Sequence, residues 1–487
     1  MIRRSEPGLF QWLVTTIIIA IALLFIYFLI QYSNARAYMP SGMVIAGIDV
    51  SGYDSEGARQ RLSERYLEAP IVIRHGDNLL DLSPERDAEL KLQIDEMILE
   101  AERKRDNLDY WAGFWGFMFG RPIEVEPVEL RAVHDRRQLR SSLEQIRSNL
   151  DIPAQPPQPV PATLSFLYGD QGLQTNVEKS LNSIEGALYR PVNREATLIL
   201  EPIAAPRPNI NLLGSLIVNH MQVFSGAYSI HILDPDKGDE FSVNADLPMS
   251  GNSQLKLPIA IETLRVFGNP PEQQYLTLIE EMLLEQGDQS ADQLLDLIAG
   301  ESGSCEGPAQ VTEMIQKLGL VNTFISTPYE SPADSCPETL ETPANTTPGY
   351  PTIPTLSNQT TAREISALYL MLYDCANKGG GTLVAVFEGN VSQSECEFIL
   401  SIMKKNRIGS LIEEGIPPET PIAHRHGWIS DTHADAGIVY SENGDYIIVI
   451  MLYNRDWLEW SVSSPLIADI SQATYNYFNF DNPFLTN

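Results

Sequence analysis

The chain has 487 residues, of which 64 are acidic and 33 basic, so its formal net charge is −31 at pH 7. This length exceeds one ordinary domain, and two or three folded units are expected. Because a nucleic-acid backbone is bound by a basic face, the acidic balance argues against a nucleic-acid partner and is expected to favour solubility.

A hydrophobic segment near the N-terminus, residues 9–30, carries no charged side chain. At about 1.5 Å per helical residue it is long enough to cross a bilayer core of about 30 Å. Arg3 and Arg4 precede it, and Arg36 is the only nearby basic residue after it, which places the N-terminus in the cytoplasm. We expect a single-pass anchor in the cytoplasmic membrane within residues 1–37, with the bulk of the chain extracytoplasmic.

A cleaved signal peptide is the alternative interpretation of this segment. Residues 35–37 read Ala-Arg-Ala and resemble a small-x-small cleavage site. The hydrophobic segment is nevertheless longer than the roughly 7 to 15 residues of most signal peptides, which favours an uncleaved anchor.

Residues 38–152 are predicted to form a first small α+β module. Residues 44–50 and 70–73 have the composition of strands, and Gly52 follows the first of them. Between these strands lies a predicted helix whose hydrophobic residues share one face: Ala58, Leu62 and Tyr66.

A second small α+β module is predicted over residues 153–205. It opens with a proline-rich segment, residues 153–159, which is expected to be an extended link. A strand is predicted at residues 196–200, after a helix with one hydrophobic face formed by Leu181, Ile184 and Leu188.

The first module carries the sequence Gly-Ile-Asp-Val-Ser-Gly at residues 47–52, behind the anchor and ahead of the helix with Ala58 and Leu62. This order resembles a peptidoglycan-binding module found in tandem on many bacterial surface proteins. The resemblance implies peptidoglycan as a partner.

Residues 111–119 form an unusually aromatic run, Trp-Ala-Gly-Phe-Trp-Gly-Phe-Met-Phe. Such a run can lie on a membrane surface or contact sugar rings. The interpretation we favour is a core or domain-contact segment.

The four cysteines all lie on the C-terminal side of the anchor, where an oxidising compartment is expected. Three pairings are possible, and we predict the two that close short loops, Cys305 with Cys336 and Cys375 with Cys396. Zinc is the alternative, but no two cysteines have Cys-x-x-Cys spacing.

Residues 206–487 are predicted to form one larger domain, which begins after the prolines at positions 206 and 208. Strands are expected near both ends and helices between them, with a closing helix over residues 465–477. The pattern predicts an α+β fold, an α/β sandwich whose antiparallel sheet carries a helical subdomain. The predicted strands lie at residues 228–233, 241–244, 436–440 and 446–452.

Ser253-Gln254-Leu255-Lys256 lies at the start of a predicted hydrophobic helix. Residues three apart on a helix face the same side, so the Lys256 amine can lie against the Ser253 hydroxyl. A desolvated lysine can accept the serine proton, and the helix N-terminus favours negative charge nearby. The spacing makes Ser253 a candidate nucleophile and Lys256 its candidate base.

A second motif lies at residues 424–428, His-Arg-His-Gly-Trp, just before a predicted strand. With the Ser-x-x-Lys motif it resembles the class A serine β-lactamase and penicillin-binding (DD-peptidase) family, in which a Lys-Thr-Gly strand borders the active site. Thr361-Ala362 before a helix and Gly415-Ile416-Pro417 before the strand fit the same pattern. The resemblance covers residues 212–487 and implies an acyl-enzyme at Ser253, formed with β-lactams or D-alanyl peptides of peptidoglycan.

The family's Ser-Asp-Asn motif is altered in this chain. Gly287 stands where the family has a proton-relaying serine, Asp288 is retained, and Gln289 can offer a side-chain amide to a substrate. Ser290 is the nearest replacement for the missing hydroxyl, although a shift of three residues on a tight turn is expected to point it elsewhere.

The third motif is altered too, because Arg425 replaces lysine and His426 replaces threonine before Gly427. Arginine keeps the positive charge and can hold a substrate carboxylate with two hydrogen bonds. His426 is either a donor to that carboxylate or a structural residue. The oxyanion hole would use the backbone N–H of Ser253 and one from the strand after Gly427.

A metal site is the alternative for the histidine-rich strand, but the Gly-Trp after the histidines fits the hydrolase strand better, so no cofactor is expected. Its four candidate ligands are His424, His426, Asp431 and His433.

A glutamate that activates the deacylating water is the least supported part of the site. Glu330, Glu338 and Glu341 lie in the expected region, but none is followed by the family's Leu-Asn. Acylation is therefore expected to reverse slowly, as in a penicillin-binding protein. The competing hypothesis is a cell-wall binding or scaffolding protein that keeps the fold and pocket but has lost turnover.

Overall fold

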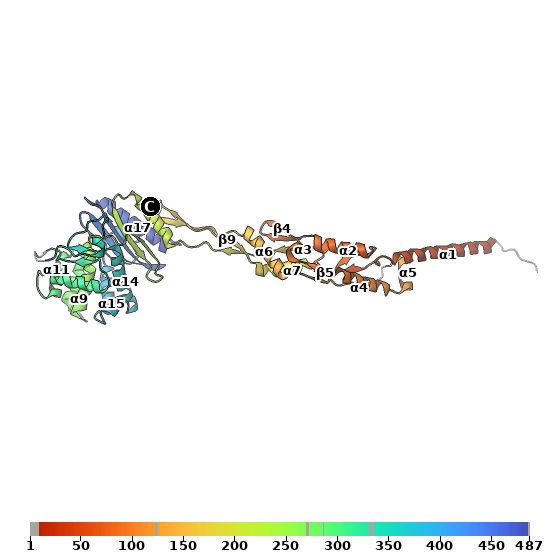
Figure 1. Ribbon diagram of the computed structural model, residues 1–487, viewed down its shortest axis with the longest axis horizontal. Coiled ribbons are helices and arrows are strands. Elements are labelled where there is room, and N and C mark those ends of the chain that lie inside the picture. The colour runs from red at the N-terminus through yellow and green to blue at the C-terminus, as the bar shows by residue number, and fades with distance from the viewer. Residues whose placement is uncertain (1–8, 122–124, 269–271, 286, 331–335, 486–487) are drawn as a thin grey trace, which may run out of the picture. The chain divides into compact units, whose positions relative to one another are not determined.

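The computed structural model describes residues 9–121, 125–268, 272–285, 287–330 and 336–485 (Figure 1). The chain forms two compact units. The N-terminal unit contains residues 1–155 and 171–204, and the C-terminal unit contains residues 156–170 and 205–487.

The N-terminal unit begins with helix α1 (Leu9–Ala35). Over Phe10–Ala35 this helix is long and apolar enough to cross a membrane, and it is the one such helix in the part of the chain that the structure describes. The predicted apolar helix is therefore present, and it continues five residues beyond the predicted end.

A first small core follows α1. It is built from the hairpin β1 (Val44–Ile45) and β2 (Ile48–Asp49), with α2 (Ser55–Ser63), a π-helical turn at Glu64–Glu68, and α4 (Ile94–Asp106). The predicted helical face is buried here, at Ala58, Leu62 and Tyr66. Helix α5 (Tyr110–Met118) follows α4 in the chain. The strands β5 (Lys91–Leu92) and β6 (Ala132–Val133), which precede and follow these two helices, form an antiparallel pair.

A second core in the same unit combines both of the predicted modules. The strands β3 (Ile71–His75) and β4 (Asn78–Leu82) form a hairpin, and β10 (Glu195–Thr197) pairs with β3 in parallel. The helices α3 (Pro84–Ala88), α6 (Arg136–Leu150) and α7 (Val177–Leu188) cover it. The antiparallel pair β9 (Gly172–Thr175) and β11 (Leu200–Ile203) completes the unit.

This division differs from the predicted modules 38–152 and 153–205. An isolated two-stranded hairpin is marginally stable, so β3 and β4 need a further strand and a helical cover. The segment 171–204 supplies both, because β10 extends the sheet and Leu181, Ile184 and Leu188 of α7 pack on it. Residues 156–170 instead join the C-terminal unit, as the hairpin β7 (Gln158–Val160) and β8 (Ser165–Leu167).

The C-terminal unit contains a five-stranded antiparallel sheet in the order β13-β12-β18-β17-β16. The strands are β12 (Ala227–Leu233), β13 (Glu240–Val243), β16 (Ile422–Trp428), β17 (Thr432–Ser441) and β18 (Gly444–Tyr453). The four predicted strands are present and form two hairpins, and strands from the two ends of the domain meet where β12 pairs with β18.

Helices cover both faces of this sheet (Figure 1). Successive residues of β18 point to opposite faces: Ile447 and Val449 pack with α9 (Lys256–Phe267) and α14 (Ala362–Lys378), whereas Ile448 and Ile450 pack with α8 (Ile210–His220) and α17 (Trp460–Phe478). The predicted α+β sandwich is confirmed.

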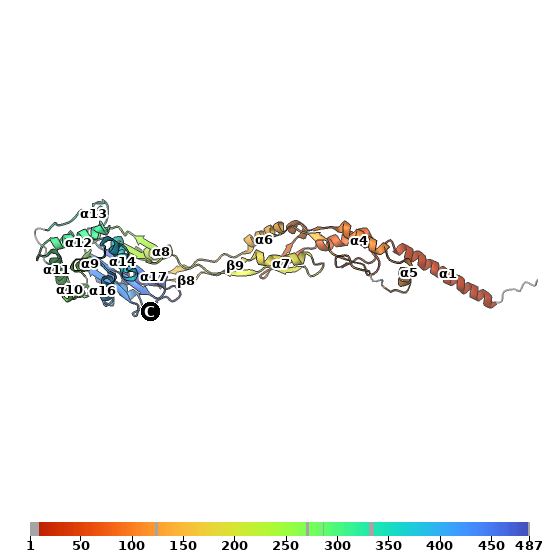
Figure 2. The same cartoon turned by 90° about the horizontal axis from the view of Figure 1, so that it is seen from below.

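The helical subdomain continues the α9 face of the sheet. Figure 2 shows α10–α13 gathered at one end of the unit and α8 and α17 at the other. The helices of this subdomain are α10 (Gln273–Leu284), α11 (Asp288–Ala299), α12 (Glu306–Lys317), α13 (Pro343–Thr346), α15 (Thr382–Val386) and α16 (Gln393–Met403). It also contains the short strand pair β14 (Phe324–Ile325) and β15 (Asn358–Gln359).

The predicted cysteine pairs are the observed ones. Cys305 is bonded to Cys336, and Cys375 of α14 is bonded to Cys396 of α16. The second disulfide is buried inside the helical core, with Cys375 fully buried and Cys396 1% exposed. It therefore joins two helices that already pack on each other.

Candidate active site

Ser253 lies in a short 3-10 turn, Asn252–Leu255, immediately before α9. The preceding residue, Asn252, has a left-handed backbone with φ of 46°, which is unfavourable for a residue with a side chain. Two distant groups hold it there: Asn358 accepts the Asn252 N–H at 2.9 Å, and the Tyr329 hydroxyl donates to the Asn252 carbonyl at 3.1 Å. Such strain is typical of turns that present a functional side chain.

Lys256 is the first residue of α9, and its side chain is fully buried. Its Nζ donates to Asp288 Oδ1 at 2.5 Å. Burial and the positive charge of Arg425 lower the pKa of Lys256 to about 8, although the Asp288 carboxylate opposes the shift. A lysine in this environment exchanges its proton near neutral pH, as a general base requires.

Asp288 opens helix α11 directly after Gly287, whose φ is 54°. A Cβ atom at Gly287 would lie 2.5 Å from Met282 Cα and 2.8 Å from the Glu281 carbonyl oxygen. The backbone therefore leaves no room for the family's serine. Ser290 does not replace it, because its hydroxyl donates to Glu281 Oε2 at 3.0 Å.

The edge strand β16 forms the opposite wall. A Cβ atom at Gly427 would lie 2.9 Å from the Ser253 backbone nitrogen, so only glycine permits this approach. The Ile429 N–H bonds to the Thr432 carbonyl of β17. Because alternate residues of a strand face opposite edges, the Trp428 N–H faces away from β17, toward the side where Ser253 lies.

Arg425 borders the cavity, but its side chain is buried and bonded within the protein. Its two terminal nitrogens donate to the backbone carbonyls of Leu283 at 2.8 Å and Glu285 at 2.9 Å. Arg425 was expected to donate two hydrogen bonds to a substrate carboxylate. In the structure it donates two hydrogen bonds to the end of α10 instead. A buried guanidinium needs such acceptors, and the nearest ones belong to the protein.

His426 lies on the cavity wall, with its ring stacked on Trp428 at a centroid distance of 5.1 Å. Burial lowers the pKa of His426 to about 4, so the ring is neutral at neutral pH. Its Nδ1 atom is buried and has no hydrogen-bond partner among the described residues. The His426 ring is therefore a neutral, partly unpaired group at the edge of the cavity.

Three of the four residues of the metal alternative have separate hydrogen-bond partners. His424 Nδ1 is 3.1 Å from both carboxylate oxygens of Asp435, and His433 Nδ1 is 2.5 Å from Ser463 Oγ. Asp431 accepts a hydrogen bond from Thr432 Oγ1 at 2.9 Å. Within the described ranges no three His, Cys, Asp or Glu side chains are grouped to hold a metal ion.

These walls enclose a cavity of about 310 Å³. Five predicted site residues line it, and two do not: Lys256 lies behind Asp288, and Gln289 is exposed on α11. Its lining is Ser253, Leu284, Glu285, Asp288, Ile408, Arg425, His426, Gly427 and Trp428.

Besides the apolar Leu284 and Ile408, three polar or aromatic contributors were not predicted from the sequence. Glu285 lies in the cavity lining, Trp428 both lines it and stacks on His426, and Tyr329 supports the turn before Ser253. The Gly-Trp pair of the third motif includes Trp428, so the sequence contained a signal for this residue. Neither Glu285 nor Tyr329 belongs to a recognisable motif.

None of the three glutamates considered for deacylation lines this cavity. The Glu330 backbone N–H donates to Asp292 Oδ2, and Glu338 borders a different cavity, beside Tyr329 and Asn358. Glu341 is exposed.

Comparison with known families finds one match. Residues 264–478 match the family described as the beta-lactamase enzyme family. The match confirms the predicted relationship of the C-terminal unit, and it begins after Ser253 and Lys256. Comparison with curated proteins finds no matching sequence. The resemblance of residues 47–52 to a peptidoglycan-binding module stays a prediction.

Solved structures similar to part of this chain include β-lactamases and PBP-A. An acyl-enzyme complex of a PBP-A mutant with penicillin G is 20% identical and covers 56% of this chain and 99% of its own, with a TM-score of 0.43. A β-lactamase from Sphaerobacter thermophilus is 15% identical, with coverages of 56% and 98% and a TM-score of 0.42. The TLA-1 extended-spectrum β-lactamase is 16% identical, with coverages of 55% and 99% and a TM-score of 0.42.

Proposed function

We propose that this protein is a membrane-anchored, extracytoplasmic serine hydrolase of the β-lactamase and DD-peptidase class. The observation that carries the proposal is the arrangement around Ser253: a strained turn places it at a polar cavity, and the next helix begins with a buried lysine of depressed pKa. The anchor is α1, with its N-terminus in the cytoplasm, as Arg3 and Arg4 suggest.

The proposed first step is acylation of Ser253. Neutral Lys256 takes the hydroxyl proton as Ser253 Oγ attacks the carbonyl carbon of a β-lactam or D-alanyl peptide. The oxyanion lies against the N–H groups of Ser253 and Trp428. The C–N bond then breaks, the leaving nitrogen takes the proton from Lys256, and an ester at Ser253 remains.

Asp288 and His426 would serve as positioning groups for this reaction. Asp288 holds Lys256 through a 2.5 Å hydrogen bond and is itself 43% exposed at the cavity. The His426 ring lines the cavity and is neutral at neutral pH, so its protonated nitrogen would donate to the substrate carboxylate. This arrangement would take over part of the anchoring that Arg425 does not provide.

Deacylation is proposed to be slow. Of the three glutamates considered above, none lines the cavity, and Glu285, which does line it, lies at the end of α10, outside the region where the family's glutamate is expected. The protein would accordingly trap β-lactams rather than destroy them rapidly.

One experiment tests the proposal directly. The full chain, purified in detergent, is incubated with a labelled penicillin and weighed intact by mass spectrometry, with Ser253→Ala as the control. We expect one covalent adduct that is absent from the control. If neither an adduct nor hydrolysis of a chromogenic cephalosporin is observed, the enzyme proposal is rejected.

Gly287 supports a second candidate function, a cell-wall binding protein without turnover. The glycine removes a hydroxyl that would relay a proton to the leaving group, and its surroundings admit no side chain. A purified protein that binds peptidoglycan fragments but forms no adduct with penicillin would favour this function.

A further inference from the structure

Helix α5 in the N-terminal unit exposes large aromatic side chains. Residues 110–120 contain no charged residue. In this segment Trp111 is 52% exposed, Trp115 45%, Phe117 44% and Phe119 65%. An exposed cluster of this kind usually marks an interaction site.

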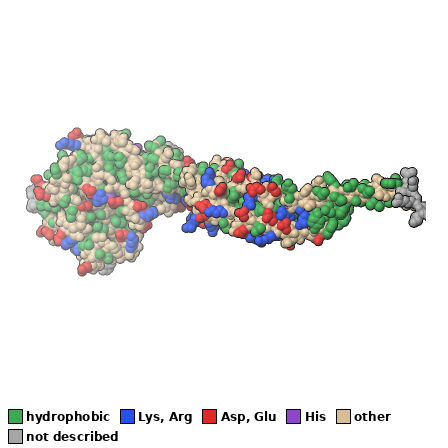
Figure 3. Space-filling view, turned by 45° about the vertical axis from the view of Figure 1, so that its right-hand side comes forward, with side chains coloured by type: hydrophobic (Ala, Val, Ile, Leu, Met, Phe, Trp, Pro, Cys, Tyr) green, Lys and Arg blue, Asp and Glu red, His purple; other side chains and the backbone are tan. Residues whose placement is uncertain are grey.

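The same helix packs on the second half of α1. The ring of Phe25 lies 5.1 Å from Phe114 and 6.2 Å from Trp115. Further along α1, Tyr32 lies 5.3 Å from Tyr110 and 5.6 Å from Phe117. Figure 3 shows the hydrophobic side chains of α1 continuing onto the adjoining surface. The favoured interpretation of residues 111–119 as a contact segment therefore accounts for the face toward α1, and not for the exposed one.

The depth of Phe25 follows from helix geometry. A bilayer core of about 30 Å takes about 20 helical residues, so a span that begins at Leu9 reaches about Phe28. Phe25 then lies roughly 5 Å inside the core. If Arg36 instead marks the outer surface, Phe25 lies deeper, about 16 Å below that arginine. On either basis the residues that touch Phe25 lie at the level of the membrane.

We propose that α5 is a second membrane-contacting element, which inserts Trp111, Trp115 and Phe119 among phospholipid chains of the outer leaflet beside α1. The inference rests on the proposed anchoring by α1. Tryptophan and other aromatic residues favour this interfacial level, and the segment carries no charge that would oppose insertion.

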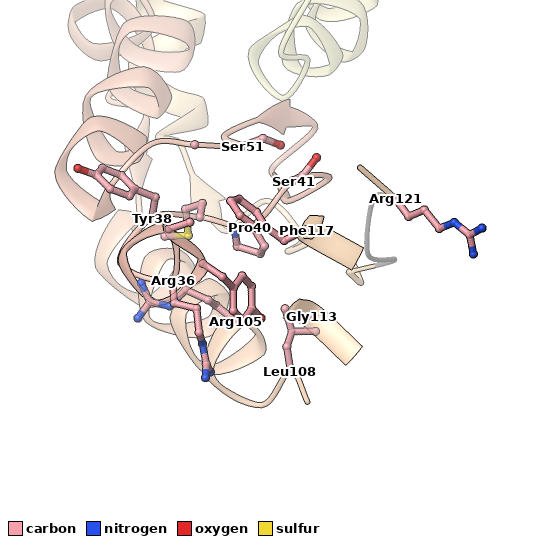
Figure 4. A pocket seen from close by; sticks show the side chains of 14 residues that line it. Arg36, Tyr38, Pro40, Ser41, Ser51, Arg105, Leu108, Gly113, Phe117 and Arg121 are labelled. Carbon is pink, nitrogen blue, oxygen red and sulfur yellow. The ribbon is translucent and has the colours of Figure 1, made fainter. Parts of the chain in front are cut away.

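A cavity beside α5 suits part of one phospholipid. Its volume is about 480 Å³, and its hydrophobic lining includes Tyr32, Leu108 and Phe117. Arg36 and Arg105 also line it (Figure 4). Arg36 lies over the Tyr110 ring, 5.4 Å from its centroid. An acyl chain would occupy the hydrophobic part, and the Arg36 guanidinium would meet a lipid phosphate, whereas Arg105 is paired with Asp106 at 2.9 Å.

Photo-crosslinking in the full chain tests this inference. Benzoylphenylalanine replaces Trp115 or Phe119 in protein reconstituted into phospholipid nanodiscs, and lipid adducts are detected by mass spectrometry after irradiation. Leu24 of α1, 56% exposed, tests the anchor. Leu79 of β4, 57% exposed in the same unit, is the matched control outside the membrane.

We expect lipid adducts at positions 24, 115 and 119 and none at position 79. An adduct at position 24 without adducts at 115 and 119 overturns the inference and leaves the anchor in place. Absence of lipid adducts at all positions overturns the anchoring proposal together with the inference. Adducts to protein alone at positions 115 and 119 assign α5 to a protein contact and also overturn the inference.

Discussion

At the scale of single residues, the chemistry depends on what surrounds Lys256. Burial and Arg425 favour its neutral form, whereas the hydrogen bond and charge of Asp288 favour the ammonium. The balance leaves a pKa of about 8, so roughly one lysine in ten is neutral at pH 7. Arg425 and Asp288 therefore shift the pKa of Lys256 in opposite directions.

This balance predicts the pH dependence of acylation. The base must be deprotonated, so the acylation rate is expected to rise with pH, with a midpoint near 8. Asp288→Asn removes the charge that raises the pKa of Lys256, and its midpoint should shift to lower pH. Quenched-flow measurement of adduct formation between pH 6 and 10 provides the test. A midpoint that stays fixed in the variant would argue against Lys256 as the base.

Gly287→Ser is predicted to destabilise the protein rather than restore a family-like site. The new Cβ would meet Met282 Cα at 2.5 Å, on a backbone that also disfavours side chains. We expect a loss of several kcal/mol in the free energy of unfolding, because strain and a steric clash add.

Gly300→Ser is the matched control for that substitution. Gly300 also has a positive φ, of 75°, but no heavy atom lies within 4 Å of its built Cβ. Backbone strain alone should cost about 1 to 2 kcal/mol. Denaturant unfolding compares the two, and equal losses would show that the contact with Met282 is unimportant.

At the scale of elements, Arg425 connects the edge strand β16 to the end of α10. The guanidinium donates hydrogen bonds to the backbone carbonyls of Leu283 and Glu285 at the C-terminal end of α10. No further helical turn follows there to supply N–H donors to these carbonyls. Gln254 Nε2 adds a hydrogen bond from the serine turn to the Arg425 carbonyl, at 2.5 Å. Three elements of the site are therefore joined through one residue.

Arg425→Met is predicted to have two separable effects. Loss of the hydrogen bonds to buried carbonyls should lower the free energy of unfolding by about 2 to 5 kcal/mol. Loss of the positive charge should raise the pKa of Lys256 and move the acylation midpoint to higher pH, opposite to Asp288→Asn. Unfolding curves and pH profiles measure the two effects, and an unchanged midpoint would contradict the second.

At the scale of the whole molecule, the chain leaves the N-terminal unit and returns to it. Residues 156–170 belong to the C-terminal unit, whereas residues 171–204 belong to the N-terminal unit. The chain therefore passes between the two units three times. Each unit nevertheless has its own buried cores, so each is expected to respond separately to a core substitution.

Ile184→Ala tests this independence. Ile184 is fully buried between α7 and the β3 sheet, and truncation to alanine should cost about 2 to 5 kcal/mol. We expect calorimetry to show a lower transition temperature for the N-terminal unit alone, with the penicillin adduct at Ser253 forming as in the unmodified protein. A parallel shift of all transitions would show that the units unfold together.

The sequence by itself determined the features that depend on neighbouring residues. The length and polarity of α1, the hairpins β12–β13 and β17–β18, and the Ser253 to Lys256 spacing all follow from local composition and periodicity. The cysteine pairing was also predictable, because each bond closes a short loop.

Only the tertiary structure decided which distant groups meet. Asp288 binds Lys256 across 32 residues, Arg425 binds Leu283 across 142, and β10 pairs with β3 across more than 100. Arg425 carries the positive charge that the motif suggested, but it donates its hydrogen bonds to backbone carbonyls of the protein, because a buried cation needs nearby acceptors. Packing between elements chooses such partners, and no local pattern encodes them.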